Sequence, residues 1–206
     1  MALAKRLATR TPVGWKDNLV RLRGYSAMEL KELRRHYEPR SLVIRAAEPD
    51  DAAAISELLL HAFGRNAEDQ RADALRRNGG MICELAADYR GAIVGYIGFA
   101  RVAAAIDGRP VEALAILPLA VESAFRELGI ARRLVAAGLA EARASGADAV
   151  FVRGEASFFG KFGFSAKVAK RFMDQASEPI LSVIEFSPGT LAGKTGSVAF
   201  PVSSGP

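Results

Sequence analysis

The sequence predicts an α/β fold with a mixed, mostly antiparallel sheet of about seven strands and helices on both faces. Two observations support this prediction. Between residues 81 and 121, three strand patterns follow one another with only short turns between them, which is typical of an antiparallel meander. A run of apolar residues at helical spacing then leads to a further buried strand at 149–152, and strands that are connected through a helix are usually parallel.

The chain of 206 residues is long enough for one domain of about 150 residues plus an extension. Half of the residues are hydrophobic and a quarter are charged, as in a soluble globular protein. No uncharged stretch reaches the roughly 20 apolar residues of a membrane-spanning helix. Lys5, Arg6 and Arg10 interrupt the N-terminal segment, which therefore lacks the apolar run of a secretory signal. We expect a cytoplasmic protein without a membrane span.

A single cysteine, Cys83, excludes an internal disulfide and a multi-cysteine metal site. Only two histidines are present, His36 and His61, so we expect no zinc site and no metal cofactor. Cys83 lies in a hydrophobic strand pattern, where a lone cysteine is usually part of an inert core. His61 lies at the end of a predicted helix and is expected to be structural.

The positive charge is concentrated near the N-terminus. Residues 1–40 carry a formal charge of +6, whereas residues 41–206 carry −1. We therefore predict a basic N-terminal extension over 1–40 that contains a short helix, followed by a folded domain over 41–206. Because the domain itself is not basic, nucleic-acid binding is not expected. The extension is interpreted as solvated or loosely docked, with contact to an anionic surface as the alternative.

The helix of the extension should begin at Ser26, because Ser26 and Glu29 have the spacing of a capping box. Leu30 and Leu33 follow at helical spacing, and Pro39 ends the helix.

The folded domain should start with a strand at 42–44. Pro49 and the two aspartates after it then open a helix, because acidic residues in a first turn complement the helix dipole. The buried face of that helix is predicted to consist of Ile55, Leu58, Leu59 and Ala62. A second helical stretch is expected over 66–77.

The three central strands are predicted over 81–87, 92–105 and 111–121. Asp107-Gly108, between the second and the third, is a strong signal for a two-residue hairpin. Glycines and alanines inside the second strand indicate close packing or a bulge.

The chain then changes to a helical period over 128–142, and Gly146 should cap that helix. The remaining expected elements are a buried strand over 149–152, a short aromatic helix over 157–162, and strands over 164–168 and 181–186.

The turn between the third central strand and the following helix is the most informative segment. The start of a helix presents free backbone N–H groups and the positive end of its dipole, so it can bind a phosphate or pyrophosphate. Gly129 and Ala131 are small, which lets a ligand approach the backbone closely. Arg126, Arg132 and Arg133 could supply positive charge. The alternative is an ordinary strand-to-helix turn with solvated arginines.

The residues of this turn resemble a known signature. Arg126-x-x-Gly129-x-Ala131 is similar to the Arg/Gln-x-x-Gly-x-Gly/Ala motif of the GNAT superfamily of N-acetyltransferases. As in that family, a strand precedes the motif, an amphipathic helix follows it, and an aromatic segment ending in Phe-Gly-Phe164 comes later. The segment 186–196 resembles a subgroup of small bacterial-type members. The resemblance extends over roughly residues 42–201 and leaves the N-terminal extension unexplained.

The resemblance implies acetyl-CoA as co-substrate, and two parallel strands, 113–121 and 148–153, that diverge to admit it. The backbone of Leu119, Ala120 and Val121 would bind the pantetheine arm. The turn would bind the pyrophosphate through Arg126, Leu128, Gly129, Ile130, Ala131 and Arg132. The reaction would be direct attack of a primary amine, on a small molecule or a protein, helped mainly by proximity and orientation.

The aromatic segment departs from the family pattern. Many members have a tyrosine that protonates the departing CoA thiolate, and the matching position here is Phe159, which the resemblance places beside the cofactor. Ser157 or a water could supply the proton instead, and a thiol of pKa ~8.5 is in any case a tolerable leaving group. Two alternatives therefore stay open, namely a degenerate acyl-CoA-binding regulatory module and an acyltransferase with a longer acyl donor.

Two carboxylates are candidates for the general base. Glu112 lies early in the strand that leads to the turn, and Glu122 lies at its end. Either could deprotonate a substrate ammonium directly or through water, and the alternative for each is a solvated carboxylate at a strand end. The sequence does not define the acceptor amine, and a homodimer is compatible with this interpretation.

Overall fold

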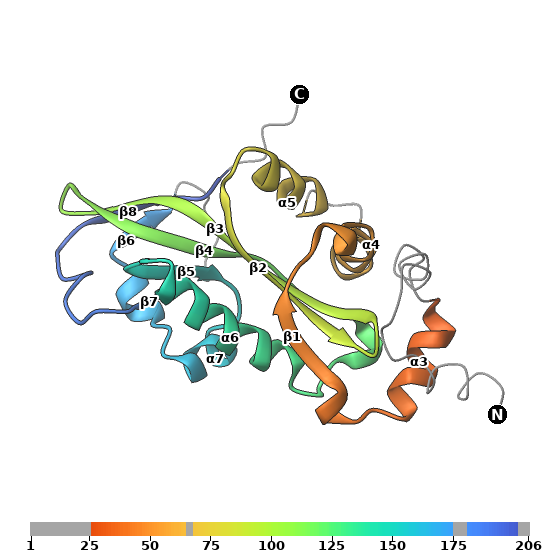
Figure 1. The fold of residues 1–206 in the computed structure, drawn as a ribbon. Coiled ribbons are helices and arrows are strands. Elements are labelled where there is room, and N and C mark those ends of the chain that lie inside the picture. Colours follow the sequence, from red (N-terminus) through yellow and green to blue (C-terminus); the bar gives the residue numbers. More distant parts are fainter. Residues whose placement is uncertain (1–25, 65–67, 175–180, 202–206) are drawn as a thin grey trace. The chain divides into compact units, whose positions relative to one another are not determined.

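A computed structural model describes residues 26–64, 68–174 and 181–201, and element labels follow Figure 1. The chain divides into two compact units. Unit 1 comprises Met1–Asp69, Glu84–Ile97 and Leu119–Val135, and unit 2 comprises Gln70–Cys83, Gly98–Pro118 and Ala136–Pro206. Strands β2, β3 and β4 and helix α6 each contribute residues to both units.

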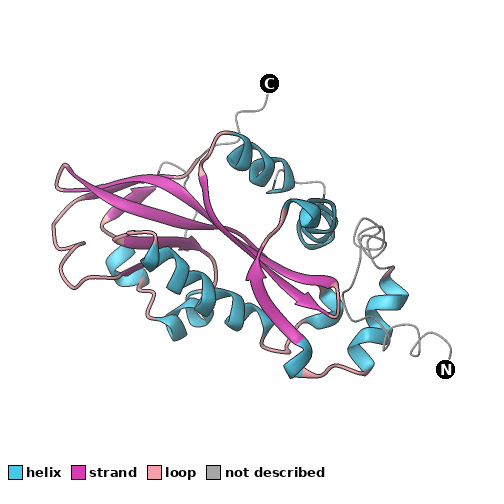
Figure 2. Cartoon of the chain, viewed as in Figure 1, coloured by secondary structure: helices cyan, strands magenta, loops and turns pink. Residues whose placement is uncertain are grey.

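The strands form one eight-stranded sheet with the order β1-β2-β3-β4-β5-β7, in which β8 pairs with β3 and β6 (Figure 2). Their bounds are β1 Leu42–Ala46, β2 Met81–Tyr89, β3 Ala92–Ile106, β4 Arg109–Val121, β5 Ala149–Arg153, β6 Phe172–Asp174, β7 Leu181–Glu185 and β8 Gly196–Ala199. β1 and β2 are antiparallel, whereas β4 and β5 are parallel. The predicted mixed α/β sheet is confirmed, with one strand more than expected.

Along the chain the α-helices lie before β1, between β1 and β2, and on either side of β5. They are α3 Ala27–Arg35, α4 Ala52–Phe63, α5 Glu68–Arg77, α6 Ile130–Ala144, α7 Ala156–Phe159 and α8 Ala166–Ala169, with short 3-10 turns at η1 Pro39–Ser41, η2 Pro49–Asp51, η3 Ser123–Phe125 and η4 Gly160–Phe162. The predicted capping box of α3 is confirmed, because the Ser26 hydroxyl accepts from the Glu29 N–H and the Glu29 carboxylate accepts from the Ser26 N–H.

In unit 1, the first half of α6 packs closely on the sheet at a glycine. A Cβ atom at Gly95 would lie 3.0 Å from the side chain of Leu134 and 3.1 Å from that of Ile130. Both of those helix residues are buried. The predicted close approach inside the second central strand is therefore confirmed, and the missing side chain at position 95 sets how near α6 lies to β3.

Part of the predicted N-terminal extension packs into unit 1. Leu30 and Leu33 of α3 are buried. The ring of Tyr37 packs against Tyr89 of β2 and edge-on against Phe125 of η3, with ring centroids 5.1 and 6.2 Å apart. The predicted boundary at residue 40 thus falls inside a packed unit, whereas residues 1–25 of the extension lie outside the described residues.

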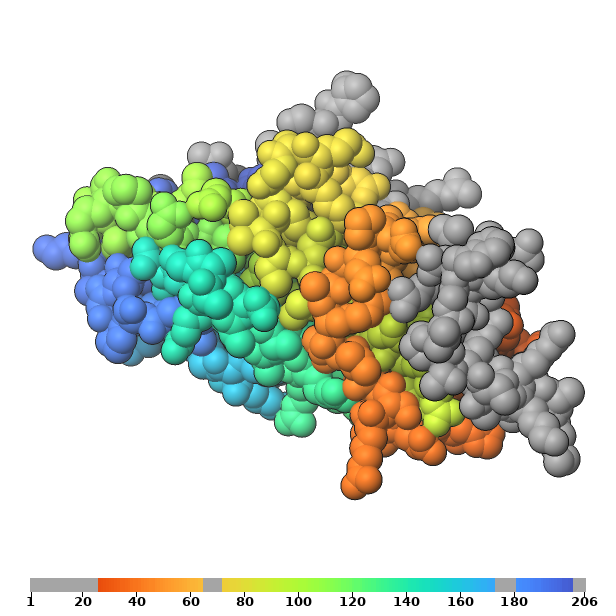
Figure 3. All heavy atoms as spheres, viewed as in Figure 1, coloured from red at the N-terminus to blue at the C-terminus, as the bar shows by residue number. Residues whose placement is uncertain are grey.

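Strand β1 is the end strand of the sheet order. Its Val43 side chain is 54% exposed, although the neighbouring Leu42 is buried. In the space-filling view the orange part of the chain, which includes β1, lies at the molecular surface (Figure 3). Successive side chains of a strand point to opposite faces, so the exposed Val43 indicates that at this position one face of β1 meets solvent.

In unit 2, the predicted hairpin between β3 and β4 is confirmed. Asp107 and Gly108 both have positive φ, 48° and 78°, as the two central residues of a type I′ turn require. The Asp107 carboxylate also accepts from the backbone N–H groups of Lys194 and Thr195, 3.1 and 2.9 Å away, just before β8. These two donors lower the pKa of Asp107, because they favour its charged form.

The predicted strand at 164–168 is wrong. The Ser165 hydroxyl accepts from the Val168 N–H at 3.1 Å and so caps the short helix α8, while only Ser165 itself bridges to β7, at Val183. A serine that satisfies a free helical N–H outweighs the strand propensity of its neighbours. Strands β6 and β8 were not predicted, because three or four residues are too few for a recognisable alternating pattern.

Among the helices of the described ranges, none combines the length and the apolar character that crossing a membrane would need.

The close contact between Gly138 of α6 and a buried ring predicts the effect of a substitution on the stability of unit 2. A Cβ atom there would lie 2.2 Å from the ring of Phe99, which is fully buried. Gly138→Ala should gain about 1 kcal/mol of helix propensity but lose more to the clash, for a net destabilisation of about 1–3 kcal/mol. Urea unfolding measures this. Gly160→Ala is the matched control, since nothing lies within 4 Å of its Cβ position, and an equal loss in both variants would contradict the prediction.

Candidate functional site

The parallel pair β4 and β5 is joined only at its beginning. In unit 2, Ala113–Ala115 pair with Ala149–Phe151. β5 stays paired with β7 as far as Arg153, whereas β4 continues to Val121. This short pairing agrees with the expected divergence of the two parallel strands.

In unit 1, β4 ends in a turn whose backbone is unusual. After η3 the chain takes positive φ at Glu127 (67°) and again at Gly129 (78°), and α6 then begins at Ile130. Nothing lies within 4 Å of the position that a Cβ atom would have on Gly129. The backbone at this point is therefore open to a ligand, as the two small residues of the motif predict.

The start of α6 supplies hydrogen-bond donors at the same turn. The Arg133 N–H donates to the Gly129 carbonyl at 3.1 Å, so the N–H groups of residues 130–132 precede the hydrogen-bonded part of the helix. The positive end of the helix dipole adds to these donors. A fifteen-residue helix preceded by an open glycine is suited to bind an anion such as a phosphate.

The predicted arginines of the turn have different surroundings. Arg126 and Arg132 are exposed beside the turn. Arg133 instead donates to the carbonyls of Pro39 and Leu42, 3.2 and 2.8 Å away, so its guanidinium is directed at the N-terminal segment. Of the three arginines, Arg126 and Arg132 remain the candidates for an anion. The other predicted binding residues lie in the same unit: Ala120 and Ile130 are buried, and Leu119, Val121, Leu128, Gly129 and Ala131 are half-buried.

Glu122, at the end of β4, is largely buried and well partnered. Its side chain is 10% exposed, and its N–H donates to the Val94 carbonyl of β3. The Ser123 hydroxyl donates to one carboxylate oxygen at 2.8 Å. Nδ1 of His61, on α4, lies 3.7 Å from the other carboxylate oxygen. We expected His61 to be structural, and no local sequence signal links it to Glu122, which is 61 positions away.

The second candidate base, Glu112, is in a different environment. It lies near the beginning of β4 in unit 2, where its exposed carboxylate pairs with Arg101 of β3 at 2.8 Å. The turn follows the opposite end of the same strand. Glu112 thus has the features of a solvated ion pair. In unit 1, Glu84 accepts a hydrogen bond from the buried hydroxyl of Tyr96, a pairing that the sequence did not predict.

The aromatic segment lies in unit 2. Phe159 is buried between Phe158 and Phe164, and a Cβ atom at Gly154 would lie 2.6 Å from its ring. The Ser157 hydroxyl donates to the carboxylate of Glu155, so its proton is already engaged in this structure. Neither residue offers a hydroxyl proton that is free for a leaving group.

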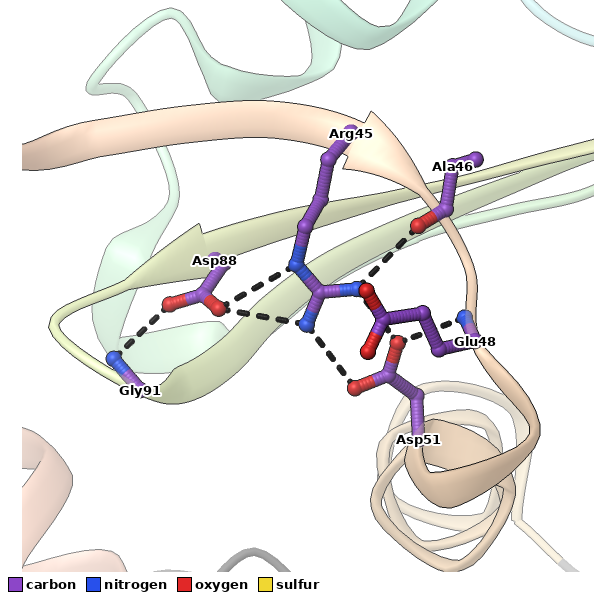
Figure 4. A network of polar contacts seen from close by, with 6 residues as sticks. All are labelled: Arg45, Ala46, Glu48, Asp51, Asp88 and Gly91. Atoms are coloured by element: carbon purple, nitrogen blue, oxygen red, sulfur yellow. Dashed lines mark hydrogen bonds and ion pairs between the residues drawn. The ribbon is translucent and has the colours of Figure 1, made fainter. Parts of the chain in front are cut away.

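Helix α4, which carries His61 near its end, is anchored at its start by an ionic network (Figure 4). The Asp51 side chain is 1% exposed and accepts from both terminal nitrogens of Arg45, at 2.5 and 2.9 Å. Arg45 also donates to Asp88 of β2, and the Glu48 N–H donates to Asp51 at 2.8 Å. The hydrogen bonds to Asp51 raise the pKa of Arg45, so the network stays charged.

No group of three or more potential metal ligands occurs within the part of the chain that the structure describes.

Known proteins share the sequence pattern and the fold of this chain. The model of the acetyltransferase (GNAT) family matches residues 31–164, a range that includes most of α3 and the whole turn. The chain is 32% identical over 162 residues to the uncharacterized N-acetyltransferase YhbS of Escherichia coli K12, covering 77% of this chain and 96% of YhbS. It is 31% identical over 121 residues to the uncharacterized N-acetyltransferase YjhQ of the same organism, which covers 57% of this chain and 66% of YjhQ.

Two solved structures have the same fold over most of the chain. The structure of Escherichia coli YhbS in complex with CoA is 30% identical with a TM-score of 0.72, and the match covers 82% of this chain and 94% of that one. A GNAT family acetyltransferase from Brucella melitensis in complex with acetyl-CoA is 26% identical with a TM-score of 0.65. That match covers 79% of this chain and 97% of the Brucella protein.

The anchor of α4 generates a second stability prediction. Asp51→Asn keeps an acceptor for the Glu48 N–H but removes the charge that neutralises Arg45. We expect the free energy of unfolding to fall by about 2–3 kcal/mol. This is at the low end of the roughly 3–5 kcal/mol lost when a buried ion pair is broken, because Arg45 still pairs with Asp88. Denaturant unfolding at pH 7 measures the loss. Asp50→Asn, one residue earlier and exposed, should change stability by less than about 0.5 kcal/mol, and equal effects of the two substitutions would refute the assignment.

Proposed function

This chain belongs to the acetyltransferase (GNAT) family, and on that premise we propose that it transfers an acetyl group from acetyl-CoA to a primary amine by direct attack. The observation that carries the proposal is the turn at 126–131, where an open glycine, positive-φ backbone and the start of a long helix coincide. Arg126, Leu128, Gly129, Ile130, Ala131 and Arg132 would hold the pyrophosphate. The CoA and acetyl-CoA complexes of the two related structures support this assignment.

The backbone of β4 supplies the second part of the cofactor site. Its last three residues, Leu119, Ala120 and Val121, lead directly into the turn in unit 1. Their side chains are half-buried or buried, so binding there would use backbone N–H and carbonyl groups rather than side chains. Such contacts would hold a pantetheine arm and its thioester in one orientation. Orientation of this kind accounts for much of the rate gain when two reactants are brought together.

Of the two carboxylates, we propose Glu122 as the general base. It follows the strand that would hold the thioester, whereas Glu112 is an exposed ion-pair member at the other end of β4. A substrate ammonium would give one proton to the Glu122 carboxylate. The nitrogen–carbon bond then forms as the carbon–sulfur bond breaks, and the second nitrogen proton passes to the leaving thiolate. His61 is half-exposed beside Glu122, and a protonated His61 imidazole would stabilise the charged form of the Glu122 carboxylate.

A binding module that holds acyl-CoA without turnover is a second candidate. The favouring observation is the buried phenylalanine at position 159, together with the hydroxyl of Ser157 that is engaged by Glu155. An unassisted thiolate departure remains chemically feasible near neutral pH, because an ordinary thiol has a pKa of ~8.5. A positioned acid typically adds about 10²–10⁴-fold, so its absence slows the reaction rather than preventing it.

Cofactor binding at the turn is tested by two substitutions at one position. Gly129→Glu places a negative charge where the phosphates would lie, so the Kd for CoA should rise at least tenfold, which is about 1.4 kcal/mol. Titration calorimetry measures the Kd. Gly129→Ala is the matched control, because it introduces the same backbone strain at φ 78° without the charge. A folded Gly129→Glu variant with the affinity of the alanine variant would overturn the site.

The reaction and its base are tested together by thiol release from acetyl-CoA with a panel of primary amines. We expect amine-dependent release by the wild type, and a fall of kcat of about 10²–10⁴-fold in Glu122→Gln at pH 7. The Kd for CoA should be unchanged in that variant. Glu112→Gln serves as the comparator and should retain wild-type kcat. CoA binding without release for any amine would favour the binding module, and a larger loss in Glu112→Gln would move the base to that residue.

A further inference from the structure

We infer that residues 34–42 brace the turn at 126–131 from both ends, and that Arg34 is a positioning residue for CoA binding. The inference rests on the proposed function for its ligand, but the brace itself is seen in the contacts of unit 1. It gives a role to a segment that the charge pattern assigned to a loosely docked extension.

The first end of the brace is made by Arg34, in the last turn of α3. Its Nη1 atom donates to the carbonyl of Ala124 and lies 3.4 Å from the carbonyl of Arg126. These carbonyls lie at the end of η3, and the last carbonyl groups of a helical turn have no donor within the turn itself. A cation in this place also complements the negative end of the local backbone dipoles. Arg34 therefore fixes the residue at which the turn begins.

The second end of the brace runs in the opposite direction. Arg133, in the first turns of α6, donates to the carbonyls of Pro39 and Leu42. The guanidinium of Arg34 thus reaches across from the N-terminal segment to the turn. The guanidinium of Arg133 reaches from α6, after the turn, back across to the N-terminal segment. Glu127 and Gly129, the two residues with positive φ, lie between these crossings.

The segment that makes the brace is itself held firmly. The Tyr89 hydroxyl of β2 donates to the His36 carbonyl at 2.9 Å and accepts from the Glu38 N–H at 3.0 Å. Tyr37, between them, packs against Tyr89 and against the fully buried Phe125. Residues 34–42 are therefore tied to the sheet by the hydrogen bonds of the Tyr89 hydroxyl and by ring contacts, and can transmit that rigidity to the turn.

A turn of this shape needs such support. A non-glycine residue at positive φ is disfavoured, so Glu127 without the brace would sample other conformations. Only the fraction of molecules with the donors correctly aligned could bind a pyrophosphate. The observed Kd equals the intrinsic Kd divided by that fraction, so a looser turn weakens binding even though no contact to the ligand is removed.

Arg34→Ala tests the inference in the full-length protein. We expect the Kd for CoA and the KM for acetyl-CoA to rise about tenfold, with kcat changed less than twofold. Turnover of S-acetyl-pantetheine, which lacks the pyrophosphate, should be unaffected. Arg34→Lys should recover part of the affinity, because an ammonium also donates to a carbonyl. Arg35→Ala is the matched control, since that side chain is 75% exposed and, among the described residues, pairs with Glu32 of the same helix.

Hydrogen exchange of the CoA-free protein provides the second measurement. Hydrogen-bonded amides at the start of α6, such as the Arg133 N–H that donates to the Gly129 carbonyl, should exchange faster in Arg34→Ala than in the wild type, while those of β2 and β3 keep their protection. A folded Arg34→Ala variant with wild-type Kd and exchange would overturn the inference, and so would an equal loss with S-acetyl-pantetheine. A wild type that binds no CoA would instead refute the proposed function, and the exchange measurement would still decide whether Arg34 holds the turn.

Discussion

Arg34 and Arg133 each donate to backbone carbonyls of the other's segment, and this pair of crossings is the contact on which the turn between β4 and α6 depends. The turn has to leave a strand, pass twice through positive φ and start a helix within a few residues. Buried apolar groups on both sides, Phe125 before it and Ile130 after it, fix where the chain enters and leaves. The backbone at Gly129 can stay open to a ligand because the residues on both sides of it are fixed by burial and by the two arginines.

The elements that the sequence predicts correctly are those with local signals. Ser26 and Glu29 cap a helix whatever lies around them, and Asp107-Gly108 reverses the chain by its own backbone preferences. The motif around Gly129 is likewise read from neighbouring residues. The same local logic explains the error at 164–168, where the capping hydroxyl of Ser165 prevails over an apolar pattern that had suggested a strand.

Features made by distant residues could not be predicted in this way. His61 and Glu122 meet through the packing of α4, whose start is held by Asp51 and Arg45, and no spacing in the chain encodes that meeting. The net charge of residues 1–40 predicts a separate extension, but a sum of charges does not show what the individual arginines bind. Charge alone separates residues 1–40 from the rest, whereas the burial of Leu30 and Leu33 joins α3 to unit 1.

The acceptors in both crossings are main-chain oxygens, those of Ala124 and Arg126 on one side and of Pro39 and Leu42 on the other. Every amino acid carries the same carbonyl group, so these four positions can drift in evolution without loss of the hydrogen bonds. Within these four hydrogen bonds, only the two guanidinium donors are constrained by side-chain chemistry. In a set of orthologues, the arginines would therefore show no covariation with the residues whose carbonyls they bind. Instead, the two arginines, about a hundred residues apart, should be retained together.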